Sequence, residues 1–473
     1  MTTYNILDFG AIGDGCFNNA SVIQQAIDTC SQNGGGRVVV PAGGVFVTGP
    51  FDLKSHVELN LEPNATLRAS TDEALYTQTP FRNRSEGSIW IGARDARNIS
   101  ITGAGIIDGR GSAFMASEEP THYNYKMENG VDLRPHLLTL IGCHNITIRD
   151  VTFKDAAYWC IHPAGCTDVL IQGVRVLNSL KVRNCDGIDI DHCRNVRITS
   201  CYIESADDCI CIKNRRDFDE YGPCENITVT GCVLTSTSCA IKLGSENMDA
   251  MRNLIFDSCV IRATNRGVGI QNRDEGSIEN VIFSNIIIQG RLFADVWWGK
   301  AEPIYVTAFK RAPGTRFRFP EGQGEGRVGK VKNIRFINIL CQSENGVYVS
   351  GCNDSRIEDL LFENVRVEIN KTTTYRGGLY DRRPCDVPGI IERRSAGFYL
   401  NQADEVTLRN CKVVWGPNRP DYFGHAAEAH DVNGLKIDYL KGTAAHPERD
   451  EPIHIVPEAD VELGEGYPEF HQE

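Results

Sequence analysis

The sequence contains no apolar run that approaches the roughly 20 residues of a membrane-spanning helix. It has no excess of basic residues either: 49 Lys and Arg stand against 62 Asp and Glu, a formal net charge of -13. An acidic chain repels polyphosphate and anionic lipid headgroups, so neither nucleic acid nor a membrane is an expected partner. The opening MTTYNILDFGAIGDG lacks a basic segment followed by an apolar core. We therefore expect a cytoplasmic protein, or a secreted one if a leader has been removed.

Cysteine is sparse for a protein held together by disulfides. The chain has 18 cysteines in 473 residues, whereas a disulfide scaffold has more than about 8–10%. Many of them end short apolar segments, as do Cys201, Cys232 and Cys259. We interpret most of them as small core residues in a reducing compartment. The paired Cys and His spacings of a zinc site are absent from the sequence, and we predict no cofactor and no metal.

Helical periodicity is nearly absent, and a short repeat replaces it. An Asn or Asp, an aliphatic residue, a polar residue and another apolar residue recur from Asn98, Asn145, Asp168, Asn195, Asn226, Asn253, Asn280, Asn333 and Asp359. From Asn145 onward the intervals are 23 to 31 residues, except for the 53 residues between Asn280 and Asn333, which fit two coils. Such a period is typical of a β-solenoid, in which stacked coils share one core.

We predict an all-β fold, a single right-handed parallel β-helix, in one domain over residues 1–473. The cap is expected over about 1–50, the coils over about 51–445 and a tail over about 446–473. An amphipathic pattern from Ala20 to Cys30 predicts a capping helix, with Asn19 or Ser21 as its N-cap. The recurrent Asn is expected to form a ladder of side-chain amides at the coil corners. A β-sandwich and a propeller are the alternatives, although a propeller repeat needs about 40–50 residues.

Acidic residues concentrate in two consecutive coils, where Asp186 precedes the pair Asp207 and Asp208. The 22 residues between Asp186 and Asp208 are close to one coil, and strands of neighbouring coils lie about 4.8 Å apart. Glycosidic cleavage requires one protonated and one ionised carboxyl group, and crowding the acids raises the pKa of at least one of them. We therefore predict Asp186, Asp207 and Asp208 as catalytic residues. An ordinary Asp-Gly turn and a Ca²⁺ site are the alternatives.

Several motifs carry a resemblance to a known family. They are DFGAIGDG, GGGRVVVPAG, NISITGAGIIDGRG, NCDG at Asn184 to Gly187, and Asp207-Asp208 followed by CICIK. Over most of its length the sequence resembles glycoside hydrolase family 28, the polygalacturonase-like pectin hydrolases. The resemblance implies that Asp207 is the general acid and that Asp186 and Asp208 activate water in an inverting reaction. Lys213 lies where related sequences also carry a lysine, and its alternative role is to neutralise Asp207 or Asp208.

The sequence departs from the family where the galacturonate carboxylate is bound. The family's Gly-His-Gly motif would fall near Thr237 to Cys239 and its Arg-Ile-Lys motif at Gly269 to Gln271, so the histidine and both cations are missing. Without the planar Arg and the Lys, a uronate should bind poorly there. We expect a neutral or branched sugar from pectin instead, such as a rhamnose-containing oligosaccharide. The predicted substrate-binding residues are Asn184, Lys213, Lys242, Glu246, Gln271, Arg273, Trp297 and Trp298.

Three segments interrupt the period, at about 113–135, 292–329 and 371–397, and such insertions often shape a binding face. Trp297 and Trp298 lie in the second insertion. Their rings are expected either to stack on sugar rings of the substrate or to pack within the loop itself. For an oligosaccharide substrate that reaches a cytoplasmic enzyme, we expect exo action. The open alternatives are a polysaccharide lyase or epimerase, a noncatalytic carbohydrate-binding β-helix, and a hydrolase relative that has lost activity. The sequence does not predict the oligomeric state.

Overall fold

The computed structural model describes residues 2–77, 88–118, 125–127, 134–312, 326–456 and 461–463. The fold is a right-handed parallel β-helix, which confirms the predicted fold class. The chain divides into two compact units, Met1–Val233 and Leu234–Glu473, each built from parallel coils. The organisation as one domain stays a prediction. No helix in the described ranges is long and apolar enough to cross a bilayer.

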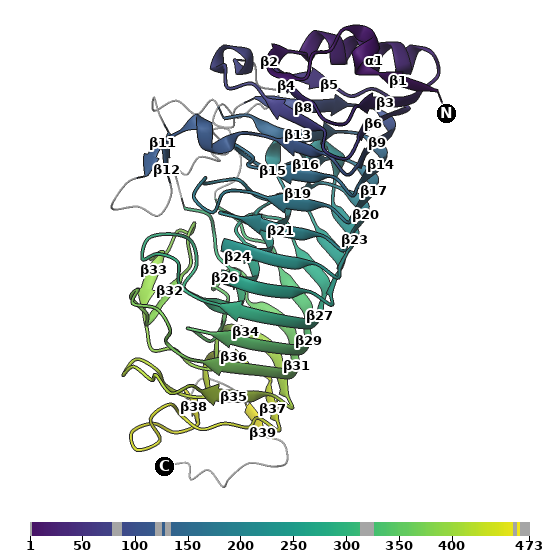
Figure 1. Ribbon diagram of the computed structural model, residues 1–473. Coiled ribbons are helices and arrows are strands. Elements are labelled where there is room, and N and C mark those ends of the chain that lie inside the picture. The colour runs from purple at the N-terminus through teal and green to yellow at the C-terminus, as the bar shows by residue number, and fades with distance from the viewer. Residues whose placement is uncertain are drawn as a thin grey trace. The chain divides into compact units, whose positions relative to one another are not determined.

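Three parallel sheets run along the first unit, and each coil adds one strand to each of them. The first contains β3 (Gly36–Val40), β6 (Val57–Leu61), β9 (Arg97–Gly103), β14 (His144–Arg149), β17 (Thr167–Gln172), β20 (Arg194–Thr199) and β23 (Cys224–Thr230) (Figure 1). The second contains β5 (Phe51–Asp52), β8 (Ile89–Arg94), β13 (His136–Ile141), β16 (Ile161–Ala164), β19 (Ile188–Asp191) and β22 (Ile210–Asn214). The third contains β4 (Val45–Thr48), β7 (Thr66–Ala69), β10 (Ile106–Asp108), β15 (Thr152–Lys154), β18 (Arg175–Leu177) and β21 (Tyr202–Ser205).

Alternation of apolar and polar residues explains how these strands bury a shared core. On β14, Ile146 and Ile148 are buried, and they lie in register with Val169 and Ile171 of β17. Because side chains of a strand point alternately to its two faces, each coil contributes one aliphatic row to the interior. The residues between them point to the other face, where Thr147 is half-buried and Arg149 is exposed.

The predicted asparagine ladder is present at the coil corners. Asn145 Nδ2 donates to Asn98 Oδ1 at 2.8 Å, and Asn226 Nδ2 donates to Asn195 Oδ1 at 3.3 Å. These residues have left-handed backbones, with φ between 54° and 60°, which asparagine tolerates better than most residues. A second ladder that the sequence reading missed joins Asn338 to Asn285 at 3.2 Å in the second unit.

Ala20–Gln32 form helix α1, and the other elements at this end of the first unit are β1 (Thr3–Asn5), the 3-10 helix η1 (Ile6–Phe9) and β2 (Asp14–Asn18) (Figure 1). α1 buries Ile23, Ala26, Ile27 and Cys30, and it contacts β1, β3, β5 and β6. Asn19 is its N-cap residue, although the Asn19 side chain makes no capping bond and instead accepts from the backbone N–H of Ile12. The role of α1 as a cap stays a prediction. The smaller elements of this unit are η2 (Glu73–Tyr76), η3 (Gly111–Phe114), β11 (Met115–Glu118), β12 (Tyr125–Met127) and η4 (Arg216–Tyr221).

The second unit contains longer strands and the larger insertions. Its parallel strands are β24 (Val233–Asn247), β25 (Met251–Asp257), β26 (Val260–Asn272), β27 (Ile278–Gly290), β28 (Glu302–Ala308), β29 (Val331–Ser343), β30 (Val347–Ser350), β31 (Ile357–Ile369), β34 (Phe398–Arg409), β35 (Lys412–Trp415), β36 (Ala427–Asn433), β37 (Leu435–Asp438), β38 (Ile453–Ile455) and β39 (Val461–Leu463). An antiparallel pair, β32 (Leu379–Asp381) and β33 (Ile390–Glu392), lies between β31 and β34. Phe256, Phe283, Phe336 and Phe362 stack in its core with neighbouring ring centroids 4.9 to 5.1 Å apart.

One detail of the predicted period is wrong. Val281 of β27 pairs directly with Ile334 of β29, and Asn333 Nδ2 donates to Asn280 Oδ1 at 2.7 Å. The 53-residue interval is therefore one coil and not two. The coil is long because β28 and the insertion around it lie between the two strands. The repeated motif does not indicate how many residues are inserted within a coil, so the spacing alone was misleading.

Candidate active site

Two turns from consecutive coils carry the predicted catalytic aspartates. Asp186 precedes β19, and Asp207 and Asp208 precede β22. Gly187 N donates to Asp208 O at 2.8 Å, which places Asp186 one coil from Asp208, as predicted. Gly187 is required here, since a Cβ at this position would lie 2.5 Å from the Cys209 carbonyl oxygen. The NCDG motif thus allows the two coils to approach closely.

Hydrogen bonds between the two turns fix their geometry. Ser205 Oγ donates to Cys185 O at 2.7 Å and accepts from the backbone N–H of Asp207 at 3.0 Å. Asn178 Nδ2 donates to the same Cys185 carbonyl at 2.6 Å. Ser205 and Asn178 are buried, so water does not compete for these bonds. The carboxyl groups of Asp186 and Asp207 are therefore carried by a rigid frame.

The three predicted aspartates form one cluster. One carboxyl oxygen from each of Asp186, Asp207 and Asp208 lies within 4.8 Å of the others. The three residues are only 3%, 5% and 1% exposed, respectively. Carboxyl groups this close and this dry cannot all ionise without a large cost in free energy. The cluster therefore favours a mixture of protonated and ionised acids.

The surroundings of Asp186 favour its protonated form. Burial, followed by the charges of Asp189, Asp207 and Asp208, raises the pKa of Asp186 well above its usual range, and Lys213 opposes this shift. Within the described part of the chain, Asp186 Oδ1 has no hydrogen-bond partner. The protonated form of such a carboxyl group can deliver a proton to a leaving oxygen, and its ionised form can accept one from water. Asp186 is thus kept ready for proton transfer.

Asn184 and Arg134 form a short relay to Asp207. Asn184 Nδ2 lies 3.4 Å from Asp207 Oδ2, and Arg134 Nη2 donates to Asn184 Oδ1 at 3.3 Å. The Arg134 guanidinium also stacks 4.7 Å from the centroid of the Tyr158 ring and donates to Ala157 O at 3.1 Å. Arg134 therefore orients the Asn184 amide so that its NH₂ group faces Asp207. The sequence reading missed Arg134, because 50 residues separate it from Asn184.

Lys213 lies beside another buried acid, Asp189, which was not among the predicted site residues. Its Nζ is 3.6 Å from Asp189 Oδ1 and 4.7 Å from the centroid of the Trp159 ring. Lys213 and Asp189 are both buried. The charge of Lys213 lowers the proton affinity of Asp186 and of Asp189. Lys213 is thus the partner of Asp189. Its predicted roles, neutralisation of Asp207 or Asp208 and direct contact with substrate, stay predictions.

Asp191 and His162 form a buried pair next to this group. His162 Nε2 lies 3.2 Å from Asp191 Oδ2, and Arg215 N donates to Asp191 Oδ1 at 2.9 Å. Burial lowers the pKa of His162, and the hydrogen bond and charge of Asp191 oppose this shift. For Asp191, burial favours the neutral acid, but the His162 bond and the charges of His192, His162 and Arg215 prevail and lower the pKa to about 2.

Asp191→Asn is expected to make the free energy of unfolding fall less steeply as the pH is lowered. A carboxyl with a depressed pKa in the folded state contributes stability above its unfolded pKa, and this contribution disappears as the pH falls through the folded pKa. The shift from 3.8 to about 2 corresponds to on the order of 2 kcal/mol, lost between about pH 4 and pH 2. Urea unfolding at pH 5 and at pH 2.5 measures it. If the wild type and the variant lose stability equally over this interval, the assignment to Asp191 is wrong.

The predicted binding residues Lys242, Glu246 and Gln271 belong to the second unit. Lys242 is half-buried on β24. Glu246 is buried on the same strand, and its charge helps to raise the pKa of Arg311, which binds Asp274 at 2.7 and 2.8 Å. Gln271 Nε2 donates to the backbone carbonyl of Arg383 at 2.5 Å. Their contact with a sugar stays a prediction.

Arg273 is fully buried and donates only to protein atoms. Its Nε binds Pro384 O at 2.7 Å, its Nη1 binds Asn272 O and Thr307 Oγ1 at 2.8 and 3.0 Å, and its Nη2 binds Arg382 O and Tyr305 Oη at 2.8 and 3.3 Å. These bonds use all five N–H groups of the guanidinium. We therefore expect Arg273 to position the segment 382–384, and its predicted direct contact with substrate stays a prediction.

Trp297 and Trp298 are both half-buried, with ring centroids 6.2 Å apart. The Arg383 guanidinium stacks 4.8 Å from the Trp298 centroid, and it also donates to Trp297 O at 3.2 Å. Part of the Trp298 surface is therefore covered by the insertion that contains β32 and β33. Both predicted roles, packing within the loop and stacking on a sugar, stay open for these two residues.

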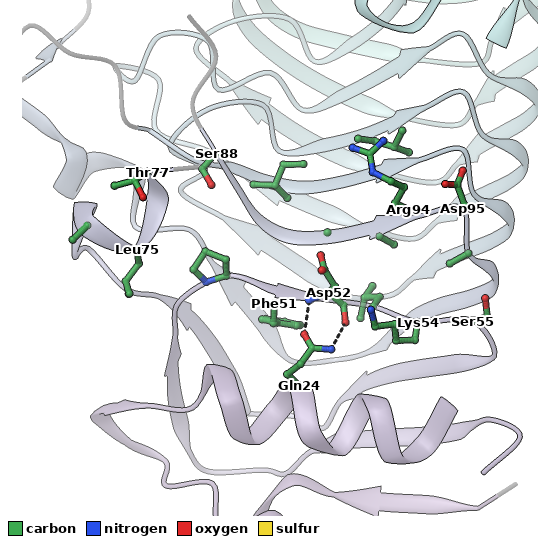
Figure 2. A pocket seen from close by; sticks show the side chains of 18 residues that line it. Gln24, Phe51, Asp52, Lys54, Ser55, Leu75, Thr77, Ser88, Arg94 and Asp95 are labelled. Carbon is green, nitrogen blue, oxygen red and sulfur yellow. Dashed lines mark hydrogen bonds between the residues drawn. The ribbon is translucent and has the colours of Figure 1, made fainter. Parts of the chain in front are cut away.

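A pocket of about 860 Å³ lies elsewhere in the first unit, between α1, β5 and β8 (Figure 2). Gln24 Nε2 donates to Asp52 O at 3.1 Å, and Asp52 N donates to Gln24 Oε1 at 2.8 Å, so α1 is tied to the wall of this pocket. None of the predicted site residues lines it. We place the chemistry at the carboxyl cluster, because proton transfer needs titratable groups and not volume alone.

The carboxyl cluster is also where a cation would bind. Among the described residues, Asp186, Asp207 and Asp208 form the one group of three acidic, His or Cys side chains whose ligand atoms lie close enough together. Ca²⁺ requires six to eight oxygen ligands, which three carboxylates supply only with help from water or substrate.

Comparisons with known proteins agree on one family. A sequence model described as "Glycosyl hydrolases family 28" matches residues 30–297. The chain is 33% identical over 261 residues to a probable polygalacturonase of Vitis vinifera, with 51% of each chain covered. It is 30% identical over 250 residues to an exo-poly-alpha-D-galacturonosidase of Dickeya chrysanthemi, covering 44% of this chain and 41% of the relative. The chain thus spans about half the length of the curated relatives it matches.

Solved structures share the fold. An exopolygalacturonase from Thermotoga maritima superposes with a TM-score of 0.64 at 24% identity, covering 78% of this chain and 87% of that one. A family 28 exopolygalacturonase from Yersinia enterocolitica gives a TM-score of 0.66 at 20% identity, covering 98% of this chain and 79% of that one. At these identities the likeness supports the β-helix and carries no residue role.

Proposed function

This chain belongs to glycosyl hydrolases family 28, and we propose that it is an inverting, exo-acting hydrolase of pectin-derived oligosaccharides. The observation that supports the proposal most strongly is the cluster of Asp186, Asp207 and Asp208, with carboxyl oxygens within 4.8 Å of one another. Hydrolysis needs one protonated and one ionised carboxyl at the scissile bond, and crowding supplies both forms in one place.

The proposed roles follow the family motifs. Asp207 protonates the leaving oxygen, and Asp186 and Asp208 activate the attacking water. Asn184, oriented by Arg134, binds Asp207 and holds its carboxyl group in place. The raised pKa of Asp186 makes the reverse assignment, with Asp186 as the acid, the defined alternative.

The proposed sugar specificity rests on the missing cations. Gly269 and Gln271 stand where the family carries Arg and Lys, and Gln271 donates to a backbone carbonyl. Arg273, two residues further on, has no N–H group left for a ligand. Neither position offers a positive charge to a uronate carboxylate. We therefore assign a neutral or branched sugar to that position, such as the rhamnose of a pectic oligosaccharide.

Polygalacturonate is expected to be a poor substrate. Each charge-assisted hydrogen bond contributes about 1.5–3 kcal/mol, so the loss of two cations should reduce kcat/KM at least about 100-fold relative to a rhamnose-containing oligosaccharide. Reducing-end release is measured over a panel of pectic oligosaccharides and aryl glycosides at equal molar concentration, with Asp186→Asn as the inactive control. Efficient cleavage of polygalacturonate would contradict the proposed specificity.

The same digests test exo action and stereochemistry. Exo action is supported by the similarity to relatives named as an exo-poly-alpha-D-galacturonosidase and as exopolygalacturonases. A ladder of intermediate oligomers would refute it. The carboxyl oxygens here approach within 4.8 Å, which is shorter than the carboxyl separation of about 6.5–9.5 Å in most inverting enzymes. Proton NMR of the first product therefore decides the stereochemistry. If the released sugar keeps the anomeric configuration of the substrate, the proposed inverting mechanism is wrong.

A lyase is the second candidate, because the same three carboxylates are able to surround a cation. A β-elimination lyase uses Ca²⁺ to acidify a uronate and releases an unsaturated product that absorbs in the ultraviolet. Loss of activity with a chelator, together with that absorbance, would favour the lyase. Full activity in the chelator, with no absorbance change, supports the hydrolase.

A further inference from the structure

The pocket between α1, β5 and β8 has a size and a lining that suit a small polar ligand. Its volume is about 860 Å³, and small-molecule sites measure roughly 300–1,000 Å³. Asp52, Lys54, Arg94 and Asp95 line it, and all four are exposed. In Figure 2 the Lys54 ammonium and the Arg94 guanidinium both extend toward the middle of the pocket, where the Asp52 carboxylate also lies. The pocket therefore presents two cations and two carboxylates to a ligand.

The fold does not use these four charged side chains. Among the described residues, none of the four forms an ion pair or a side-chain hydrogen bond. An exposed cation elsewhere in the same unit does find a partner, as Arg37 does in Glu58 at 2.9 Å. The tie between α1 and β5 runs through the backbone of Asp52, which exchanges two hydrogen bonds with the Gln24 side chain. The Asp52 carboxylate is therefore left available to a ligand.

Glycines allow the two carboxylates of the pocket to lie close to the sheet. Asp52 pairs with Gly92 in the strand register, and a Cβ at Gly92 would lie 2.7 Å from Asp52 Oδ1. Asp95 is placed in the same way, since a Cβ at Gly142 would lie 2.6 Å from Asp95 Oδ1. A larger residue at either glycine would force the carboxylate to shift. Ionised carboxylates accept hydrogen bonds and donate none, so these two are suited to hydroxyl groups.

We propose that this pocket is a binding site for a sugar that carries a carboxylate, such as a uronate unit of a pectic oligosaccharide. Lys54 and Arg94 bind the sugar carboxylate, and Asp52 and Asp95 accept hydrogen bonds from the sugar hydroxyl groups. The two aspartates repel a phosphate ion, and a neutral sugar leaves both cations without a partner, so the pocket discriminates against each. The choice of a pectic uronate rests on the proposed function, whereas the pocket and its charges do not.

The pocket is distinct from the carboxyl cluster, although both lie on the second sheet. Arg94 and Asp191 belong to one row of register partners, three coils apart. At about 4.8 Å for each coil, Arg94 is about 14 Å from Asp191 along the helix axis. Ile141, in the same row, packs against Phe218 of η4. A sugar in the pocket is therefore held apart from the bond that the cluster would cleave.

Binding of D-galacturonate to the full chain tests the proposal. In protein labelled with ¹⁵N-glycine, the Gly92 amide reports on the pocket and the Gly187 amide reports on the carboxyl cluster. Galacturonate should shift the Gly92 signal. D-galactose lacks the carboxylate and inorganic phosphate lacks the sugar hydroxyl groups, so each should need an at least about tenfold higher concentration. Absence of a shift at Gly92, a shift at Gly187 alone, or equal binding of phosphate overturns the proposal.

Lys54→Met and Arg94→Met should each raise the dissociation constant of galacturonate about tenfold or more, because each removes a charge-assisted contact. Neither residue forms an ion pair among the described residues, so both variants should unfold at nearly the wild-type temperature. Arg197→Met is the matched control, since Arg197 of β20 is also exposed but lies on the first sheet, outside the pocket. Unchanged affinity in both pocket variants, or an equal loss in Arg197→Met, contradicts the assignment.

This measurement separates the pocket from the hydrolase proposal. D-galacturonate contains no glycosidic bond, so its binding does not depend on whether the chain is an active hydrolase. Binding at Gly92 in a chain that hydrolyses no pectic oligosaccharide would keep the site and refute only the proposed function. Hydrolysis in a chain whose Gly92 signal ignores galacturonate would keep the proposed function and refute only the binding site.

Discussion

Asp207→Asn is expected to lower kcat on natural oligosaccharides by about 10²–10⁴-fold, the usual contribution of a general acid. Asparagine preserves the size of the side chain and the packing of the turn, where the backbone N–H of Asp207 is bound to Ser205 Oγ. It removes the proton that the leaving oxygen needs. Substrate affinity, measured by calorimetry, should be nearly unchanged. A noncatalytic carbohydrate-binding protein would show no turnover to lose.

The leaving group distinguishes the acid from the base. An activated aryl glycoside departs without protonation, so the activity of Asp207→Asn should be largely restored on it, whereas Asp186→Asn should stay inactive. Recovery in Asp186→Asn and not in Asp207→Asn would assign the acid to Asp186, in keeping with its raised pKa. Asp150→Asn is the matched control: Asp150 has a left-handed backbone that asparagine tolerates, and it lies exposed at a turn of the same unit.

Arg273→Met is expected to reduce the free energy of unfolding by roughly 3–5 kcal/mol. The substitution keeps an apolar stem but removes five hydrogen bonds, leaving the carbonyl groups of Asn272, Arg382 and Pro384 without this donor. Each buried acceptor left unsatisfied costs about 1–3 kcal/mol. Arg273→Lys should restore little of this, because an ammonium group cannot reproduce the planar fork. Chemical denaturation measures the loss.

Arg376→Met provides the comparison for Arg273. Arg376 precedes the same β32–β33 pair and forms an ion pair with Glu392 at 2.7 Å, but both side chains are more than half exposed. An exposed pair contributes about 0–1 kcal/mol. If the two variants are destabilised equally, Arg273 does not anchor the segment 382–384 as its bonds indicate.

The stacking of the carboxyl groups was predictable from local sequence. The number of residues between Asp186 and Asp208 is close to the length of one coil. The alternating isoleucines of the two following strands pair Ile188 with Ile210 and Ile190 with Ile212, and this register brings the two turns together. The asparagine ladder follows from the same spacing. Both features depend on interactions between adjacent coils, where a shift by one residue would turn apolar side chains outward.

The surroundings of the cluster were not predictable in the same way. Asp189 was visible only as one acid among several, and nothing in the sequence distinguished it from a solvated strand residue. Arg134 reaches Asn184 from 50 residues away, and Arg273 reaches Arg382 and Pro384 from more than 100 residues away. No repeat encodes contacts of that length, because the insertions that make them differ from coil to coil.

The sequence by itself determined the β-helix, the family and the meeting of Asp186 with Asp207 and Asp208, since short-range periodicity dictates which coils touch. Only the tertiary structure decided which charges lie next to these acids, that the 53-residue interval is a single coil, and that Arg273 binds the segment 382–384. The reason is physical: burial and the direction of a long side chain depend on everything packed around it, and that environment exists only after the chain has folded.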